Sequence, residues 1–484
     1  MSKYIGGKLI TGSIWMIASR FSLRGLGFIN TIVLARILTP EDFGLVSLAM
    51  LSAGLITIFS DIGLESAILR RPKISKNLID TAWTIGIIIS LLLSSIIFAA
   101  APLAVLYFNE PRIEPIMQLI AIQPILNAFN NIGFILYSKE LEFNKVFFRS
   151  FISKLLGVMA SIAIAFWLKN YWALPLGMLS HSLITTGLSY ILHPYRPQFC
   201  LSASKELRSD STNFLSKNIA TFLKMKADEI VVGKIGGATN LGGYYVSKSI
   251  ASMLTVELMQ PIGNALLPGY TQMLDEPERL KTAFCKVLQV VSVFAFAFGF
   301  GLAAISESFV SLVFGYKWLH IVPFLKIFAF GGLVGALQSV VSPILIAKGK
   351  LKEISVFTWF NLICFLAVLW PVAQQGNLYL IAKTLVIFDF FMLLVCYVML
   401  IKLVKLSIFD LVKSLARPFI SALIMLYGIY FFLKIGLVQQ PVIVLACSVL
   451  VGALIFISSL FISWFASGRP DGAEKIIFQK LRPE

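Results

Sequence analysis

Apolar segments of about twenty residues follow one another along almost the whole chain, separated by short polar breaks. An α-helix rises 1.5 Å per residue, so roughly 20 apolar residues cross a hydrocarbon core about 30 Å thick. The segments are Leu9–Ile37, Phe43–Leu69, Leu78–Phe108, Ile116–Tyr137, Val146–Leu168, Tyr171–His193, Asn213–Ile235, Leu241–Leu267, Ala283–Phe314, Ile321–Ala347, Ile354–Pro371, Leu378–Ile401, Leu415–Leu433 and Val442–Phe465. The sequence therefore predicts an all-α polytopic membrane protein with about fourteen transmembrane helices.

The composition supports a membrane protein and limits the ligands that the chain can be expected to bind. Of the 484 residues 58% are hydrophobic and 13% are charged, whereas soluble proteins carry roughly 25% charged residues. The net charge of +17 does not indicate nucleic acid, because a basic excess in a polytopic protein usually reflects loops held against anionic lipid. The five cysteines are scattered without metal or redox spacing, so neither a metal site nor a cofactor is expected.

The charge of the breaks predicts the orientation. Every second break is rich in lysine and arginine, and the breaks between them hold few basic residues. Basic loops stay in the cytoplasm, so both termini are predicted to be cytoplasmic. The longest break, Pro194 to Thr212, has about twenty residues, too few for a catalytic domain. The chain is therefore predicted not to be an enzyme, and its function must lie among the helices.

An internal repeat divides the chain. "ARILTPEDFGLVSLA" from Ala35 aligns without gaps with "GKIGGATNLGGYYVS" from Gly233. This spacing places six helices in each repeat, so both repeats enter the membrane in the same sense and share a pseudo-two-fold axis along the membrane normal. We expect an N-terminal lobe at residues 1–198, a C-terminal lobe at 199–402 and two further helices with a tail at 403–484, with the substrate between the lobes.

The same segments resemble a known family. "ARILTPEDFGLVSLAM" with "DIGLESAILRRP", and "DEIVVGKIGGATNLGGYYVSKSI" in the second half, are similar to helical hairpins of Wzx-type polysaccharide flippases. The resemblance implies a V-shaped, two-lobed bundle in the bacterial inner membrane. Its substrate would be an undecaprenyl-pyrophosphate-linked oligosaccharide, moved from the cytoplasmic to the periplasmic leaflet for O-antigen, capsule or exopolysaccharide export. A polysaccharide polymerase and chain-length machinery would be its candidate protein partners.

Two arginines in the first apolar segment are the leading site residues. Arg20 and Arg24 are one helical turn apart and share a face. A central arginine costs about 3 kcal/mol on insertion scales, so the pair should face the bundle interior or a water-filled cavity. One interpretation is that they grip a lipid pyrophosphate, which arginine binds bidentately. The other is a structural ion pair with Asp61 or Glu65 on the next helix.

Further polar residues lie within apolar segments. The candidate cavity cations in the second half are Lys217, Lys224, Lys248 and Lys383, and Lys226 projects away from the stripe shared by Lys217 and Lys224. The candidates for ion coupling or salt bridges are Asp61, Glu65, Asp228 and Asp389. His181 is more typical of a hydrogen-bonded structural residue than of a proton carrier.

Two other functions remain open. A multidrug or toxin extruder would share the fold, but such proteins commonly carry cations and need buried carboxylates, whereas buried basic residues predominate here. A polysaccharide polymerase or ligase usually has a large external loop, and the outward breaks of this chain are short. The last two helices have charge-free interiors, so they should not line a cationic lumen. Either they form part of a lipid-facing groove for the polyprenyl tail, or they are purely peripheral.

Overall fold

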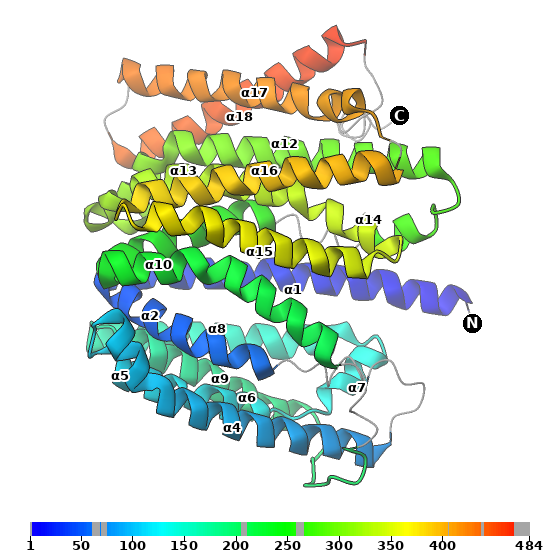
Figure 1. Ribbon diagram of the computed structural model, residues 1–484. Coiled ribbons are helices and arrows are strands. Elements are labelled where there is room, and N and C mark those ends of the chain that lie inside the picture. The colour runs from blue at the N-terminus through cyan, green and yellow to red at the C-terminus, as the bar shows by residue number, and fades with distance from the viewer. Residues whose placement is uncertain are drawn as a thin grey trace. The chain divides into compact units, whose positions relative to one another are not determined.

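The computed structural model describes residues 2–60, 68, 75–204, 211–257, 266–404, 406–436 and 440–468. For residues 2–11, 13, 14, 17, 60, 211–217, 256, 257 and 351, only the backbone is described. The chain forms two compact units, Met1–Gly242 and Gly243–Glu484. Every regular element in the described part is helical (Figure 1), which confirms the predicted all-α class. Eight of these helices are long and apolar enough, by themselves, to cross a membrane.

The first unit is a bundle of helices that pack side by side. Helix α1 packs on α8, α8 on α9 and α9 on α6, while α4 packs on α2, α5 and α6. The elements are α1 (Ser2–Ile37), α2 (Pro40–Thr57), η1 (Ile58–Ser60), α4 (Lys76–Phe108), α5 (Ile113–Ile120), α6 (Ile122–Ala128), α7 (Phe134–Lys139), α8 (Phe143–Leu168), α9 (Ala173–Leu192) and the first part of α10 (Ser211–Ser252).

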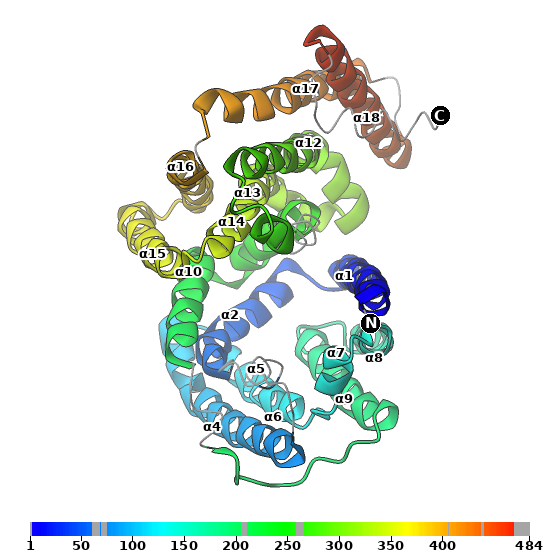
Figure 2. The ribbon, with the colours of Figure 1, turned by 90° about the vertical axis from the view of Figure 1, so that its right-hand side faces the viewer.

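The second unit is centred on α12, which packs on α13, α17 and α18 (Figure 2). Helix α16 packs on α13 and α15. The elements are the end of α10, η3 (Met253–Glu257), α12 (Pro277–Phe309), η4 (Val310–Phe314), η5 (Tyr316–Ile321), α13 (Val322–Ser339), α14 (Val341–Ala347), α15 (Leu351–Ala373), α16 (Leu378–Val404), α17 (Ile408–Ile435) and α18 (Pro441–Ala466).

Where its residues are described, each predicted span coincides with a helix or a run of short helices, and several spans differ in continuity. The fourth span is broken into α5, α6 and α7. It contains Pro124, which lacks a backbone donor, and Asn131, whose side chain accepts from the Gly133 amide at 2.9 Å in place of a helical bond. The seventh and eighth spans run together as α10, interrupted at Gly237 (φ 68°, ψ −174°). Glycine takes this positive φ at no steric cost.

The two copies of the repeat begin their second helices at matching positions. Thr39 caps α2 through a capping box with Asp42, and the repeat alignment places Gly237, where α10 breaks, opposite Thr39. Four residues that follow these breaks form what we call the glycine contact, namely Pro40, Gly44, Ala238 and Gly242. A Cβ on Gly44 would lie 1.7 Å from the Ala238 carbonyl oxygen, and a Cβ on Gly242 would lie 1.9 Å from the Pro40 carbonyl oxygen. Because Ala238 aligns with Pro40 and Gly242 with Gly44, the contact is reciprocal.

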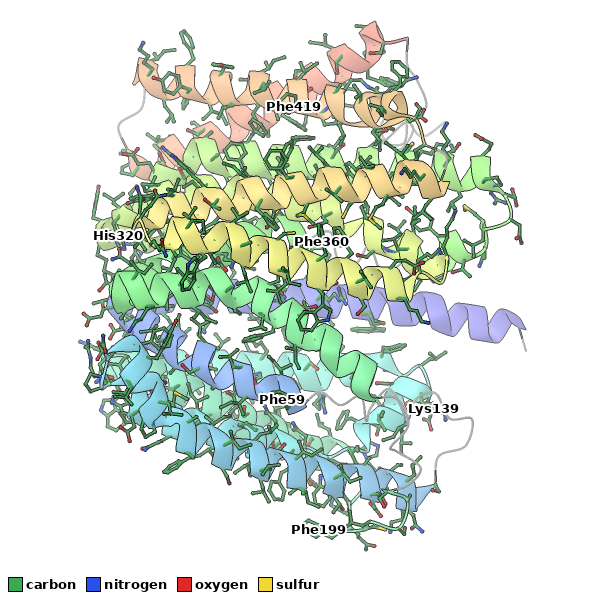
Figure 3. The ribbon with its side chains drawn as sticks, viewed as in Figure 1. Phe59, Lys139, Phe199, His320, Phe360 and Phe419 are labelled. Atoms are coloured by element: carbon green, nitrogen blue, oxygen red, sulfur yellow. The ribbon has the colours of Figure 1, made fainter. Side chains whose placement is uncertain are left out.

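Helices α17 and α18 share the apolar core of the second unit. Phe419 of α17 lies with its ring centroid 5.5 Å from that of Phe296 and 5.9 Å from that of Phe300, both on α12 (Figure 3). Ala422 and Met425 of α17 are buried in the same cluster. Dispersion and packing therefore hold α17 against α12.

The segment between α9 and α10 is tied to α4. The Tyr195 hydroxyl donates to the Asp80 carboxylate at 2.7 Å, and the Gln198 amide donates to the same oxygen at 3.1 Å. The Phe199 ring lies 5.1 Å from Trp83 (Figure 3). Burial and the Asp80 hydrogen bond raise the pKa of Tyr195, so this hydroxyl stays protonated and continues to donate at physiological pH.

Candidate functional site

Helix α1 carries two arginines at membrane depth. It runs without interruption from Ser2 to Ile37, so Arg24 lies 13 residues before its end, about 20 Å at 1.5 Å per residue. Arg20 lies one turn deeper from that end. Arg24 is exposed and Arg20 is half-buried. Since a guanidinium is costly in hydrocarbon, Arg24 at this depth requires a polar environment.

Helices α8 and α9 bring two more nitrogen groups towards Arg24. A Cβ placed on Gly27, which lies three residues after Arg24 on the same face of α1, would be 4.0 Å from Cε of Lys154 on α8. A Cβ on Gly157, one turn further along α8, would be 2.7 Å from Cδ2 of His181 on α9. The charge of Arg24 acts on Lys154, and that of Lys154 acts on His181. The three residues thus form one row across α1, α8 and α9.

The first part of α10 carries both signs of charge. Lys224 is half-buried, and Asp228 is fully buried. Lys226 pairs with Glu229 at 2.8 Å. Glu229 is 2% exposed and did not figure among the predicted site residues, although the spacing of three residues on one helix face signals such a pair.

The remaining predicted site residues are divided between the second unit and undescribed positions. Lys248 on α10 and Asp389 on α16 are half-buried, and Lys383 on α16 is exposed. Asp61, Glu65 and the side chain of Lys217 lie outside the described residues. That the cations of both units line one lumen stays a prediction. No group of three or more His, Cys, Asp or Glu side chains in the described part is placed to hold a metal ion.

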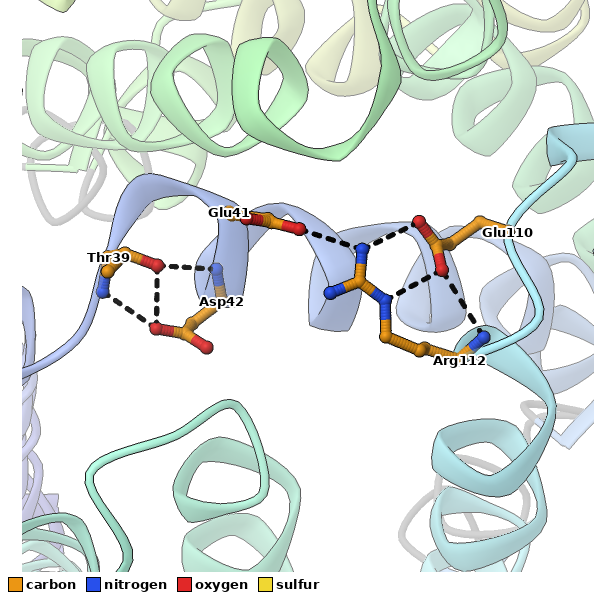
Figure 4. Close-up of polar contacts among 5 residues, drawn as sticks. All are labelled: Thr39, Glu41, Asp42, Glu110 and Arg112. Atoms are coloured by element: carbon orange, nitrogen blue, oxygen red, sulfur yellow. Dashed lines mark hydrogen bonds and ion pairs between the residues drawn. The ribbon is translucent and has the colours of Figure 1, made fainter.

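An ionic network closes one end of the first unit, on the side predicted to be periplasmic. Arg112 binds Glu41 at the start of α2 at 2.7 Å and Glu110 at 2.8 Å and 2.9 Å (Figure 4). These bonds join α2 to the turn between α4 and α5. The hydrogen bond from Arg112 lowers the pKa of Glu110 against the opposing effect of burial, and the two carboxylates raise the pKa of Arg112.

This network should make the first unit sensitive to acid. A carboxyl group whose pKa is lowered by folding stabilises the protein above its unfolded pKa, and that contribution is lost as the pH falls through the folded pKa. Glu110→Gln should therefore lower the free energy of unfolding at pH 7, and with it the melting temperature. The loss should be no more than about 1 kcal/mol, because the pair is partly exposed. The difference between the variant and the wild type should shrink as the pH falls through the lowered pKa of Glu110. A difference that does not change on acidification would mean that Glu110 acts through packing.

Sequence reasoning singled out Arg20 and Arg24 but did not place Lys154 among the site residues. Lys154 carries the same sequence signal as these two arginines, namely a charge within an apolar stretch, here "SFISKLLGVMA" of α8. What a single sequence lacks is the packing of α8 on α1, which makes Lys154 a neighbour of Arg24 rather than an isolated charge.

Comparison with known proteins agrees with this architecture. The polysaccharide biosynthesis protein family matches residues 33–323. The lipopolysaccharide biosynthesis protein WzxC of Escherichia coli (strain K12) is 28% identical, over 74% of each chain. The succinoglycan biosynthesis transport protein ExoT of Rhizobium meliloti (strain 1021) is 25% identical over 77% of this chain and 76% of that protein.

The fold also has a solved counterpart. The lipid II flippase MurJ in an inward closed conformation superposes with a TM-score of 0.69, at 14% identity, over 95% of this chain and all of that one. This likeness shows the fold, and the family match covers more than half of the chain. The protein is therefore a multi-pass membrane protein of the polysaccharide biosynthesis protein family, and it has the fold of the lipid II flippase MurJ.

Proposed function

We propose that this protein moves undecaprenyl-pyrophosphate-linked oligosaccharides from the cytoplasmic to the periplasmic leaflet of a bacterial inner membrane by alternating access. The observation that carries the proposal is the placement of Arg20 and Arg24 on one face of α1, with Arg24 about 20 Å from the helix end and exposed. The two arginines would cost roughly 6 kcal/mol if they faced lipid. A diphosphate passing this level would offset that cost and receive bidentate hydrogen bonds.

The charge balance disfavours a drug extruder. A site for organic cations needs carboxylates at the binding level, whereas the charges that act on Lys154 of α8 and on His181 of α9 are positive. The buried acids Asp228 and Glu229 lie on α10, where Glu229 already pairs with Lys226. An anionic substrate suits this arrangement better than a cationic one.

Transport by the purified protein tests the proposal. The full chain is reconstituted in vesicles loaded with a fluorescent polyprenyl-diphosphate-linked oligosaccharide, and an impermeant lectin or quencher reports the amount in each leaflet. We expect equilibration to be faster than in protein-free vesicles and to be unaffected by excess cationic drug. Export of a cationic drug without movement of the lipid-linked glycan would overturn the proposal in favour of an extruder. Collapsing an imposed proton gradient in the same assay tests coupling through Asp61, Asp228 or Asp389.

The polyprenyl tail needs an apolar path, and we propose that α17 and α18 supply it. A groove of about 500 Å³ runs between them, lined by Ile420 and Ile424 of α17 and by Leu454, Ile455, Ser458, Ser459, Ile462 and Ser463 of α18. Its lining is almost entirely apolar and carries no charge. An isoprenoid chain therefore loses little on leaving the bilayer for this groove.

Filling the groove should slow transport without unfolding the protein. Because α17 shares its core with α12, truncation before α17 would expose that core, so a point substitution is the sharper test. Ser459→Phe and Ser463→Phe should reduce the rate of lipid-linked glycan transport by about threefold or more and leave the melting temperature unchanged. Ile443→Phe, at an exposed position on α18 outside the groove, is the control. Full-rate transport by both serine variants would contradict a role for the groove.

A further inference from the structure

A second apolar groove lies within the first unit, where α10 meets α2 and α4, and we call it the first-unit groove. Its volume is about 330 Å³, within the range of about 300–1,000 Å³ that is typical of ligand pockets. Its lining carries no charge and includes Leu51, Leu55 and Ile56 of α2, Leu103 and Tyr107 of α4, and Ile230 of α10. The Ser52 hydroxyl, which also lines it, donates to the Leu48 carbonyl at 3.0 Å. The groove therefore suits an apolar ligand.

The first-unit groove opens beside exposed leucines. Leu103 is 66% exposed, and Leu106, on the same face of α4, is 73% exposed. Leu55 on α2 is 37% exposed. Such side chains on a membrane helix face hydrocarbon. The lining residues of α4 run from Ala100 to Phe108, about 12 Å at 1.5 Å per residue. A linear acyl chain matches this length of apolar surface and loses little on leaving the bilayer for it.

A lysine stands at one end of the first-unit groove. Lys234 is exposed and follows Ile230 by one turn on the same face of α10. Its ammonium group donates to the Tyr107 carbonyl and lies 5.1 Å from the centroid of the Tyr107 ring. Beside it α10 packs closely on the other helices, since a Cβ on Gly233 would lie 2.6 Å from Leu48 and 3.1 Å from Phe108. The lysine thus marks the place where the groove ends.

The bond to Tyr107 leaves most of the binding capacity of Lys234 unused. The Tyr107 carbonyl is in the last turn of α4, where carbonyls lack intrahelical donors, so the lysine caps this helix. An ammonium group has three donors, and no carboxylate in the described part of the chain forms an ion pair with Lys234. Tyrosine is typical of the headgroup level of a bilayer. A phosphate at that level can therefore bind this charge.

We propose that the first-unit groove binds an acyl chain of an anionic phospholipid whose phosphate lies at Lys234. The apolar lining and the cation at its end match the two parts of such a lipid. Lys234 lies on the side predicted to be periplasmic, so the lipid belongs to the leaflet on that side. The site is separate from the arginines of α1 and independent of the proposed transport. The bound lipid bridges α4 and α10 and should stabilise their packing.

Melting of the full-length protein in nanodiscs tests the contribution of the charge. Dioleoylphosphatidylglycerol replaces dioleoylphosphatidylcholine stepwise at constant ionic strength, and the mole fraction that gives half of the rise in melting temperature is recorded. Lys234→Gln keeps an N–H donor for the Tyr107 carbonyl but should need about fivefold more phosphatidylglycerol. Lys234→Arg, which keeps the charge, should stay within about twofold of the wild type. The control is Lys169→Gln, which removes an exposed lysine at the end of α8, outside the groove.

A filled groove tests the contribution of the acyl chain. Ala100 is half-buried and lines the first-unit groove. Ala100→Phe should lose the stabilisation by phosphatidylglycerol and melt in phosphatidylcholine at or above the wild-type temperature, because the new ring supplies the contacts of the excluded chain. Ala99→Phe is the matched control, since Ala99 is exposed on the same helix and does not line the groove. It should respond to phosphatidylglycerol as the wild type does.

Loss of the lipid response in both Lys234→Gln and Ala100→Phe supports the site. If Lys234→Gln lowers the melting temperature equally in both lipids, the lysine only caps α4 and the inference is overturned. A normal response in Ala100→Phe overturns it as well, because the acyl chain would then not occupy the groove. So does an equal stabilisation of the wild type by glycerol 3-phosphate, which carries the phosphate without the chains, or the absence of any preference for phosphatidylglycerol.

Discussion

Arg24→Ala is expected to lower the transport of lipid-linked oligosaccharide at least tenfold while the protein still inserts and folds. A hydrogen bond to a charged group contributes about 1.5–3 kcal/mol, and a bidentate arginine makes two such bonds. The side chain is exposed, so its removal opens no cavity and relieves the cost of holding a charge in the membrane. The melting temperature should stay level or rise. Arg24→Lys should recover only part of the rate, because an ammonium group cannot reproduce the planar fork.

The readouts are the flipping rate in vesicles and the melting temperature of each variant. Arg36→Ala is the matched control, since Arg36 is an exposed arginine in the last turn of the same helix. Unaltered transport by Arg24→Ala would mean that this arginine is structural or redundant. For Arg20, recovery of an Arg20→Ala defect by adding Asp61→Asn would identify an ion pair between the two helices instead of a substrate contact.

The helices could be predicted from the sequence because their signal is local. Apolar length alone marks spans such as α4 and α8, and both lie within a few residues of the predicted limits. The break in the fourth span was not predicted, since it depends on tertiary partners. The Asn131 side chain donates to the carbonyls of His193 and Tyr195, more than 60 residues away in the chain. An apolar run gives no indication of such a bond.

The candidate site could be predicted only in part, for the same reason. Insertion cost identifies Arg24 from its position in the chain, because the argument needs the depth alone. The row from Arg24 through Lys154 to His181 arises where α1 meets α8 and α8 meets α9 at Gly27 and Gly157. Glycine is common in membrane helices, so nothing in the sequence distinguishes these two from the glycines that face open space, such as Gly25 and Gly86.

The glycine contact underlies the second large effect. A Cβ added at Gly44 would lie 1.7 Å from the Ala238 carbonyl oxygen and 2.4 Å from its carbon, which are backbone atoms that cannot turn aside as a side chain can. Gly44→Ala must therefore push α2 away from the start of the second segment of α10. We expect a loss of about 3 kcal/mol, at the upper end of overpacking costs. Gly242→Ala should behave alike, because its Cβ meets the Pro40 carbonyl oxygen at 1.9 Å.

Gly86→Ala on α4 is the control, since a Cβ there meets no atom within 4 Å. It should melt at or slightly above the wild-type temperature, because alanine favours the helix over glycine by about 1 kcal/mol. The pair of repeat-related variants also tests whether the contact is a single unit. If Gly44→Ala and Gly242→Ala each separate the same two backbones, the double variant should cost clearly less than the sum of the single variants. Additive losses, or a Gly44→Ala protein that melts and transports like Gly86→Ala, would show that the two segments are not held in this reciprocal contact.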